Sequence, residues 1–117
     1  MKLIYYPNCS TCKKALKHIK EMNIECEEQD IVKNTPSKDE MKKYIENYGK
    51  GIKPFFNTSG KLYREMGLKD KVKDMSLKEA CDLLSQNGML IKRPLLIQDD
   101  RILVGYKEKE YNEFLSQ

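Results

Sequence analysis

The residues best suited to chemistry in this sequence are two cysteines at C-x-x-C spacing, Cys9 and Cys12. They follow a segment rich in β-forming residues, Lys2 to Tyr6, and a turn at Pro7-Asn8, and a helical pattern begins at Cys12. A helix N-terminus stabilises a thiolate, because its unpaired N–H groups and its dipole favour negative charge. The spacing and the position therefore predict a redox-active pair.

The two cysteines are expected to have different roles. Cys9 stands before the helix and faces solvent, whereas Cys12 lies in the first turn and is more shielded. Lys13 and Lys14 add positive charge beside them. We therefore predict that Cys9 is the attacking thiolate and Cys12 the resolving thiol, with thiol pKa values in such motifs lowered from about 8.5 to roughly 7 or below. The alternative is that both are small core residues without a chemical role.

A zinc site is the other chemistry that paired cysteines suggest. Structural zinc takes four ligands, usually from two paired motifs. The only histidine, His18, lies within the predicted helix, where it is expected to be solvated or half-buried, and Cys26 and Cys81 have no close partner. We therefore expect no metal, and we interpret Cys26 in a strand and Cys81 on an apolar helix stripe as small buried residues.

A second candidate site is Arg93-Pro94, which precedes the apolar run Leu95 to Ile97. Proline is tolerated at the first position of a strand, because that position need not donate to the ladder. A cis Arg93–Pro94 bond would expose backbone beside the sulfur, and Arg93 could pair with an anion there. The alternative, to which we give equal weight, is that Arg93 is a surface arginine and Pro94 an edge proline. Arg64, in a helical segment, is by itself typical of an exposed position.

Hydrophobic patterns predict the elements that must position these residues. Strands are expected at Lys2 to Tyr6 and Ile24 to Asp30, and a hairpin is expected around Asp99-Asp100. Helices are expected from Cys12 to Asn23, near residues 59–66 and after Gly105. Two further helices are expected to begin at the capping boxes Ser37-x-x-Glu40 and Ser76-x-x-Glu79. This order predicts one α/β domain, residues 1–117, with a four-stranded sheet and a helical insertion at approximately residues 33–88.

Composition narrows the function classes. A chain of 117 residues suits one domain, and its longest apolar runs are far shorter than the ~20 residues that span a bilayer. No secretory leader follows Met1. The formal charge is +4, but the lysines alternate with acidic residues, which is typical of a solvated face rather than a nucleic-acid site. We therefore expect a cytoplasmic domain without a membrane or direct nucleic-acid partner.

Four segments together resemble the arsenate reductase (ArsC)/Spx family. They are YPNCSTCKKA from Tyr6, FFNTSG from Phe55, NGMLIKRPL from Asn87 and VGY from Val104. The segment from Asn87 is the most specific, and the likeness spans essentially the whole chain. The resemblance implies a thioredoxin-like fold with a mixed four-stranded sheet interrupted by a helical subdomain, and a cis bond before Pro94.

The same resemblance implies a glutaredoxin-linked, arsenate reductase-like oxidoreductase. Cys9 falls on the position of the nucleophile, Cys12 is the resolving thiol, and the residues expected around a bound anion are Arg93, Arg64, Pro94, Thr11 and Lys13. This sequence departs from those enzymes at Gly105, where a third arginine is expected, and at Cys12 and Lys13, which replace a serine and an arginine. The expected substrate is an oxyanion such as arsenate or a disulfide. The expected reductant is glutathione or a dithiol protein, without a metal or organic cofactor.

The alternative within this family is a redox-sensing transcriptional regulator of the Spx/MgsR type. In that interpretation the Cys9–Cys12 disulfide changes affinity for an RNA polymerase subunit. Turnover of a substrate separates the two hypotheses, because a regulator would show none. The protein is expected to be a monomer in both.

Overall fold

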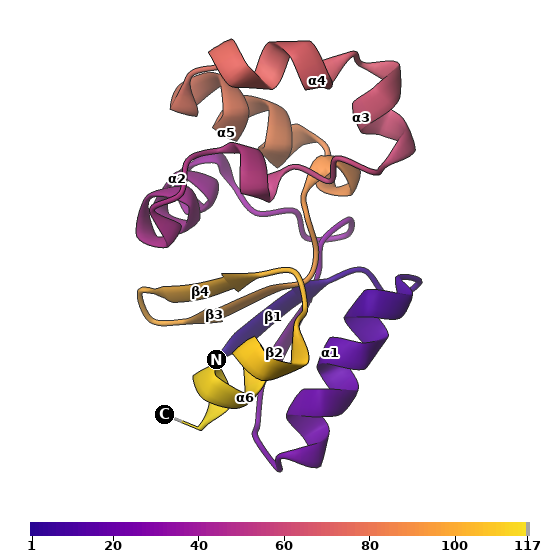
Figure 1. The fold of residues 1–117 in the computed structure, drawn as a ribbon, viewed down its shortest axis with the longest axis vertical. Coiled ribbons are helices and arrows are strands. Elements are labelled where there is room, and N and C mark those ends of the chain that lie inside the picture. The colour runs from indigo at the N-terminus through magenta and orange to yellow at the C-terminus, as the bar shows by residue number, and fades with distance from the viewer. Residues whose placement is uncertain (117) are drawn as a thin grey trace.

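A four-stranded mixed sheet lies at the centre of the protein, with strand order β2-β1-β3-β4 (Figure 1). The computed structural model describes residues 1–116. Strand β1 (Lys2–Tyr5) pairs in parallel with β2 (Glu27–Asp30) and antiparallel with β3 (Leu95–Gln98). Strand β4 (Arg101–Val104) completes the predicted hairpin with β3. The predicted α/β fold class is confirmed, and the arrangement is thioredoxin-like.

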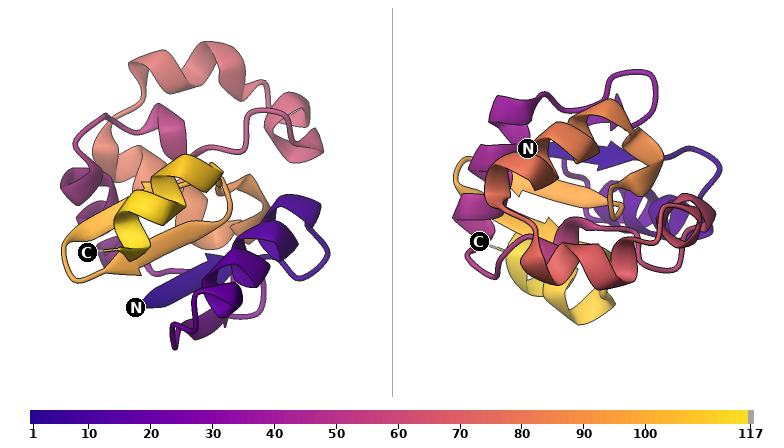
Figure 2. Two further views of the ribbon diagram at one scale, coloured as in Figure 1. Left: turned by 60° about the horizontal axis from the view of Figure 1, so that its bottom comes forward. Right: turned by 90° about the horizontal axis from the view of Figure 1, so that it is seen from above.

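Helices cover both faces of this sheet. Helix α1 (Ser10–Glu21) and helix α6 (Glu108–Leu115) lie together on one face, as the left view of Figure 2 shows. The helices between β2 and β3 form a second layer on the other face, called here the helical layer, residues 38–90. It comprises α2 (Lys38–Tyr48), α3 (Lys61–Glu65), α4 (Leu68–Lys71) and α5 (Leu77–Gln86), with 3₁₀ turns at Lys53–Phe55, Val72–Asp74 and Gly88–Leu90. Both predicted capping boxes are present, at Ser37 and Ser76.

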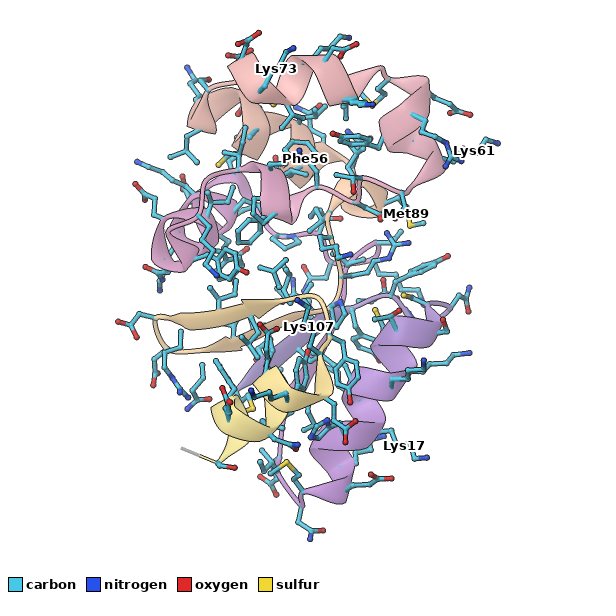
Figure 3. All side chains as sticks on the ribbon, in the orientation of Figure 1. Lys17, Phe56, Lys61, Lys73, Met89 and Lys107 are labelled. Carbon is cyan, nitrogen blue, oxygen red and sulfur yellow. The ribbon has the colours of Figure 1, made fainter. Side chains whose placement is uncertain are left out.

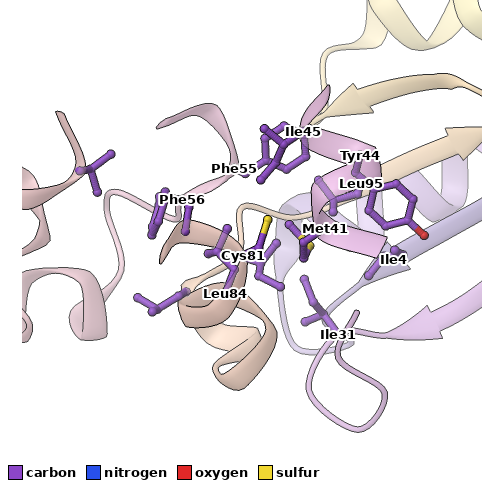
Figure 4. Close-up of a cluster of buried hydrophobic side chains, with 14 of the residues drawn as sticks. Ile4, Ile31, Met41, Tyr44, Ile45, Phe55, Phe56, Cys81, Leu84 and Leu95 are labelled. Atoms are coloured by element: carbon purple, nitrogen blue, oxygen red, sulfur yellow. The ribbon is translucent and has the colours of Figure 1, made fainter. Parts of the chain in front are cut away.

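Strand β1 is buried on both faces, which explains its nearly continuous apolar sequence. Its side chains alternate, so that Leu3 packs with α1 and α6 while Ile4 packs against the helical layer. Figure 4 shows the core between the sheet and the helical layer, in which Ile4 and Leu95 from the sheet meet Met41, Phe55 and other side chains of the helical layer. The sheet therefore holds the end of β1, where Cys9 follows, between two packed layers.

Strand β2 is shorter than the sequence pattern predicts. It begins at Glu27 rather than Ile24, because Asn23 turns the chain with a φ of 58° and pairing with β1 starts only opposite Lys2. Cys26 consequently precedes the strand and is half-buried, so the prediction of a buried strand cysteine is wrong. The prediction for Cys81 is confirmed, since that residue is buried on α5.

The single histidine links α1 to the end of the chain. His18 is half-buried, and its Nδ1 lies 2.8 Å from the Tyr106 hydroxyl while its Nε2 lies 2.7 Å from Asn112 Oδ1. Both ring nitrogens therefore have a hydrogen-bonding partner in the C-terminal part of the chain. His18 therefore has a structural role that its helical spacing alone does not indicate.

Within residues 1–116, no helix is both long and apolar enough to cross a membrane.

Candidate active site

Cys9 occupies the N-cap position of α1. Its backbone is extended, with φ −92° and ψ 123°, and its N–H donates to the Tyr6 carbonyl at 3.0 Å. Its carbonyl accepts the first hydrogen bond of the helix, from the Lys13 N–H at 3.0 Å. The side chain is half-buried, whereas Thr11 and Lys13 are exposed. Helix α1 starts at Ser10 rather than Cys12, which leaves Cys9 directly before the helix, as predicted.

The pKa of the Cys9 thiol is lowered. Partial burial by itself raises this pKa, but the Cys12 and Thr11 N–H groups, the Cys12 thiol and the Arg93 guanidinium together lower it by hydrogen-bonding interactions with the sulfur. The Cys9 side chain forms no capping hydrogen bond by the usual geometric criteria, so the N–H groups of the helix terminus act on the sulfur as dipoles that favour negative charge. Cys9 is consequently the more acidic thiol of the pair.

Cys12 has the opposite character. It is completely buried in the first turn of α1, and the Tyr6 N–H donates to its sulfur at 3.5 Å. Burial raises its pKa most strongly, the Tyr6 N–H and Arg93 lower it, and the interaction with Cys9 raises it, to about 12 in total. Cys12 is therefore the thiol of the pair that holds its proton more tightly.

Arg93 reaches this pair from the other end of the sequence. Its guanidinium lies 5.2 Å from the centre of the Tyr6 ring, and its Nη1 donates to the Met89 carbonyl at 3.2 Å. The Arg93–Pro94 bond is cis, as the resemblance implies, and the buried Pro94 accepts a hydrogen bond from the Gly105 N–H at 2.8 Å. Figure 3 shows Met89 at the boundary between the helical layer and the sheet, on the side where α1 begins.

The other predicted arginine has a different environment. Arg64 is exposed on α3, and its Nη1 donates to the Ser59 carbonyl at 3.3 Å, within its own segment of the helical layer. The groups that shift the pKa of Cys9 come instead from Cys12, Thr11 and Arg93. Tyr6 belongs to the site as well, since it contacts both Cys12 and Arg93, and sequence reasoning missed it. Its position directly after β1 and before the turn is the signal that could have found it.

Replacing Arg93 by glutamine is expected to slow alkylation of Cys9 at neutral pH on the order of tenfold, because a hydrogen bond to a charged group contributes about 1.5–3 kcal/mol in protein interiors and less near solvent. Below the thiol pKa, the rate follows the thiolate fraction. Loss of the guanidinium raises this pKa and moves the midpoint of the pH–rate profile upward. The measurement is the pseudo-first-order rate with iodoacetamide across pH.

Arg64→Gln is the matched control for this experiment, since it removes the same charge from an exposed position. Its alkylation profile is expected to overlay that of the unmodified protein. Equal effects of the two substitutions would contradict the assignment of Arg93 to the site.

Metal ligands are not clustered around the cysteines. Among residues 1–116, no three His, Cys, Asp or Glu side chains are grouped so that they could hold a metal ion. All four cysteines are free thiols, Cys9 and Cys12 included. The chemistry that this site offers with its own groups is nucleophilic attack by the Cys9 sulfur and exchange with the Cys12 sulfur.

Comparisons with known proteins agree with this description. The sequence model of the ArsC family matches residues 4–114. The chain is similar to the uncharacterized protein YusI of Bacillus subtilis, with 46% identity over 93% of this chain and 92% of the relative. It is also similar to the global transcriptional regulator Spx of Streptococcus pyogenes, with 25% identity over 98% of this chain and 84% of that protein. Among solved structures, a possible arsenate reductase from Streptococcus mutans aligns with a TM-score of 0.86 and 44% identity, over 91% of this chain and 90% of that one.

Proposed function

The chain belongs to the ArsC family, and from this premise we propose that it is a thiol–disulfide oxidoreductase with Cys9 as the nucleophile and Cys12 as the resolving thiol. The observation that carries the proposal is the opposite shift of two interacting thiols. The pKa of Cys9 is lowered and that of Cys12 is raised to about 12. One sulfur is therefore ready to attack, and the other retains its proton until the first sulfur has become part of a disulfide.

The proposed reaction has two steps. The Cys9 thiolate attacks one sulfur of a substrate disulfide, the substrate S–S bond breaks, and the other half leaves as a thiolate. When Cys9 has lost its negative charge in the mixed disulfide, its contribution to the raised pKa of Cys12 is removed, so that this pKa falls although the larger contribution of burial remains. Cys12 then gives up its proton and attacks the Cys9 sulfur, which releases the second half of the substrate. Glutathione or a dithiol protein reduces the resulting Cys9–Cys12 disulfide.

A disulfide fits this site better than arsenate does. Arg93 is the arginine that interacts with Cys9, Arg64 bonds to Ser59, and Gly105 provides no side chain. Arsenate reduction by the same cysteines would require attack of Cys9 on arsenic with loss of water, followed by attack of Cys12 and release of arsenite. Binding a tetrahedral dianion favours more than one charge-assisted contact. Turnover with arsenate is therefore expected to be much slower than disulfide exchange.

The experiment that tests this function traps the first intermediate. Cys12→Ser is expected to stop the reaction with oxidised glutathione after one step, so that one glutathione remains attached to Cys9. The unmodified protein is expected to form the Cys9–Cys12 disulfide and carry no adduct. Intact mass and peptide mapping distinguish the two products.

Cys26→Ser is the control for that trap, because Cys26 is half-buried and lies outside the site. It is expected to behave as the unmodified protein does. A glutathione adduct on Cys26 or Cys81, with none on Cys9, would contradict the proposed function.

A second candidate function is supported by the similarity to Spx over 98% of this chain. In this hypothesis the same disulfide controls binding to an RNA polymerase subunit. A regulator is expected to bind purified RNA polymerase subunits in a thiol-dependent manner without catalysing turnover. Multiple turnovers with a glutathione mixed disulfide favour the oxidoreductase.

A further inference from the structure

Three lysines surround a hollow whose lining includes Lys92, the residue directly before Arg93 of the candidate active site. The hollow, called here the lysine hollow, has a volume of about 440 Å³ and is lined by Lys50, Lys53, Pro54, Phe56, Thr58 and Lys92. No aspartate or glutamate is among these lining residues of the described chain. In residues 1–116, none of its lysines forms a salt bridge, whereas Lys38 pairs with Asp82 at 3.2 Å elsewhere in the helical layer. The lysine hollow is therefore a local excess of positive charge.

The backbone around the lysine hollow is fixed by hydrogen bonds between two distant segments. The Lys92 N–H donates to the Phe55 carbonyl at 2.8 Å, and the Asn57 N–H donates to the Leu90 carbonyl at 2.7 Å. Between them, Phe56 forms an antiparallel bridge with Ile91. Lys92 consequently extends from a backbone that is held against the segment Phe55 to Asn57.

The lysine hollow adjoins the site through Lys92. This residue directly precedes Arg93, whose guanidinium interacts with Cys9, and consecutive Cα atoms are only about 3.8 Å apart. The Lys92 side chain also passes close to Gly105, since a Cβ on that glycine would lie 3.5 Å from Lys92 Cε. The Gly105 N–H in turn bonds to Pro94. The lysine hollow is therefore joined to the site through the Lys92–Arg93 segment.

We propose that the lysine hollow binds the carboxylates of an acidic peptide segment that carries the disulfide attacked by Cys9. The inference rests on the proposed function and specifies its substrate class. Three cations around one open hollow suit several carboxylates better than a single small anion. In an extended peptide each residue spans about 3.3–3.6 Å, so acidic residues a few positions from the substrate cysteine reach the lysines. Such complementary charge increases the rate of encounter more than it changes the chemical step.

The test uses two peptides with one cysteine each, activated as mixed disulfides with thionitrobenzoate. Cys9 attacks the peptide sulfur, and thionitrobenzoate leaves as a coloured thiolate that reports the rate. Cys12 then attacks Cys9 and releases the peptide thiol. One peptide carries three aspartates separated from its cysteine by two glycines, and in the other the aspartates are asparagines. The measured quantity is the ratio of the two second-order rate constants at low ionic strength.

The unmodified protein is expected to prefer the acidic peptide by about tenfold, which is the lower end of electrostatic rate enhancements. The variant K50Q/K53Q/K92Q is expected to lose this preference and to retain its rate with the neutral peptide. The matched variant K69Q/K73Q/K78Q removes the same charge from the far part of the helical layer and is expected to retain the preference. K50R/K53R/K92R, which keeps the charges, is expected to retain it as well.

An unchanged preference in K50Q/K53Q/K92Q would overturn the inference, and so would an equal loss in both glutamine variants, which would indicate an effect of net charge. The neutral peptide reports separately on the proposed function. If it fails to react with the unmodified protein, the oxidoreductase hypothesis itself is wrong. If it reacts normally but the acidic peptide has no advantage, only the inference about the lysine hollow is wrong.

Discussion

Cys9→Ser is expected to lower the rate of disulfide exchange on the order of 10³-fold or more, because it removes the nucleophile itself. A serine hydroxyl is not ionised at neutral pH, and the N–H dipoles and guanidinium that stabilise a thiolate at this position cannot activate it to the same degree. The rate of reduction of a glutathione mixed disulfide, coupled to thiol release, is the measurement. The substitution is nearly isosteric at the half-buried N-cap, where serine is also a favourable capping residue, so the fold is expected to remain stable.

The comparison with Cys12→Ser makes this expectation specific. Cys12→Ser retains the first step and accumulates the mixed disulfide on Cys9, whereas Cys9→Ser forms no mixed disulfide. A Cys9→Ser protein that still reacts with disulfides at a comparable rate would show that another thiol is the nucleophile. The most accessible alternative to examine then is Cys26.

The largest expected effect on stability comes from Gly88→Ala. A Cβ at this position would collide with the carbonyl oxygen of Ile31 and lie 3.0 Å from the carbonyl carbon of the same residue. Both are backbone atoms, so the conflict cannot be relieved by rotating a side chain. We expect the free energy of unfolding to fall by about 3 kcal/mol, the upper end of ordinary overpacking, as measured by urea denaturation.

This glycine also positions the active site indirectly. It begins the 3₁₀ turn Gly88–Leu90, which contains the carbonyl of Met89 that accepts from Arg93. Gly60→Ala is the control, because its φ is −78° and its Cβ would lie 2.7 Å from Asn57 Nδ2, the end of a side chain that can rotate, and 3.1 Å from the Asn57 carbonyl oxygen, a milder conflict than at Gly88. We expect it to cost less than about 1 kcal/mol. An equal effect of the two alanines would contradict the close packing inferred at Gly88.

Local sequence patterns predict an element of this fold correctly where a capping or turn signal marks one of its ends. Ser37 and Ser76 begin helices through complete capping boxes, and the hairpin turns at Asp99, whose φ is 55°. The extent of β2 was overestimated, because a strand needs a partner and the pairing with β1 starts only at Glu27. That partner could not be deduced from the residues around Cys26 alone.

The site shows the same division between local and distant information. The opposite roles of Cys9 and Cys12 follow from their positions at the start of one helix, and the structure gives their pKa values opposite shifts. The contact between Tyr6 and Arg93 joins segments at opposite ends of the chain, so no local pattern indicates it. The contacts of His18 with Tyr106 and Asn112 are unpredictable for the same reason.

The central claim is that Cys9 is an ionised nucleophile coupled to Cys12. Its most direct test is a titration of the reduced protein with a thiol-specific alkylating reagent across pH, in which the modified cysteine is identified by mass mapping. We predict that Cys9 is alkylated first, with a midpoint below that of an ordinary thiol, and that mild oxidation of the same sample joins it to Cys12. An ordinary midpoint for Cys9, with no Cys9–Cys12 disulfide under oxidising conditions, would contradict the account.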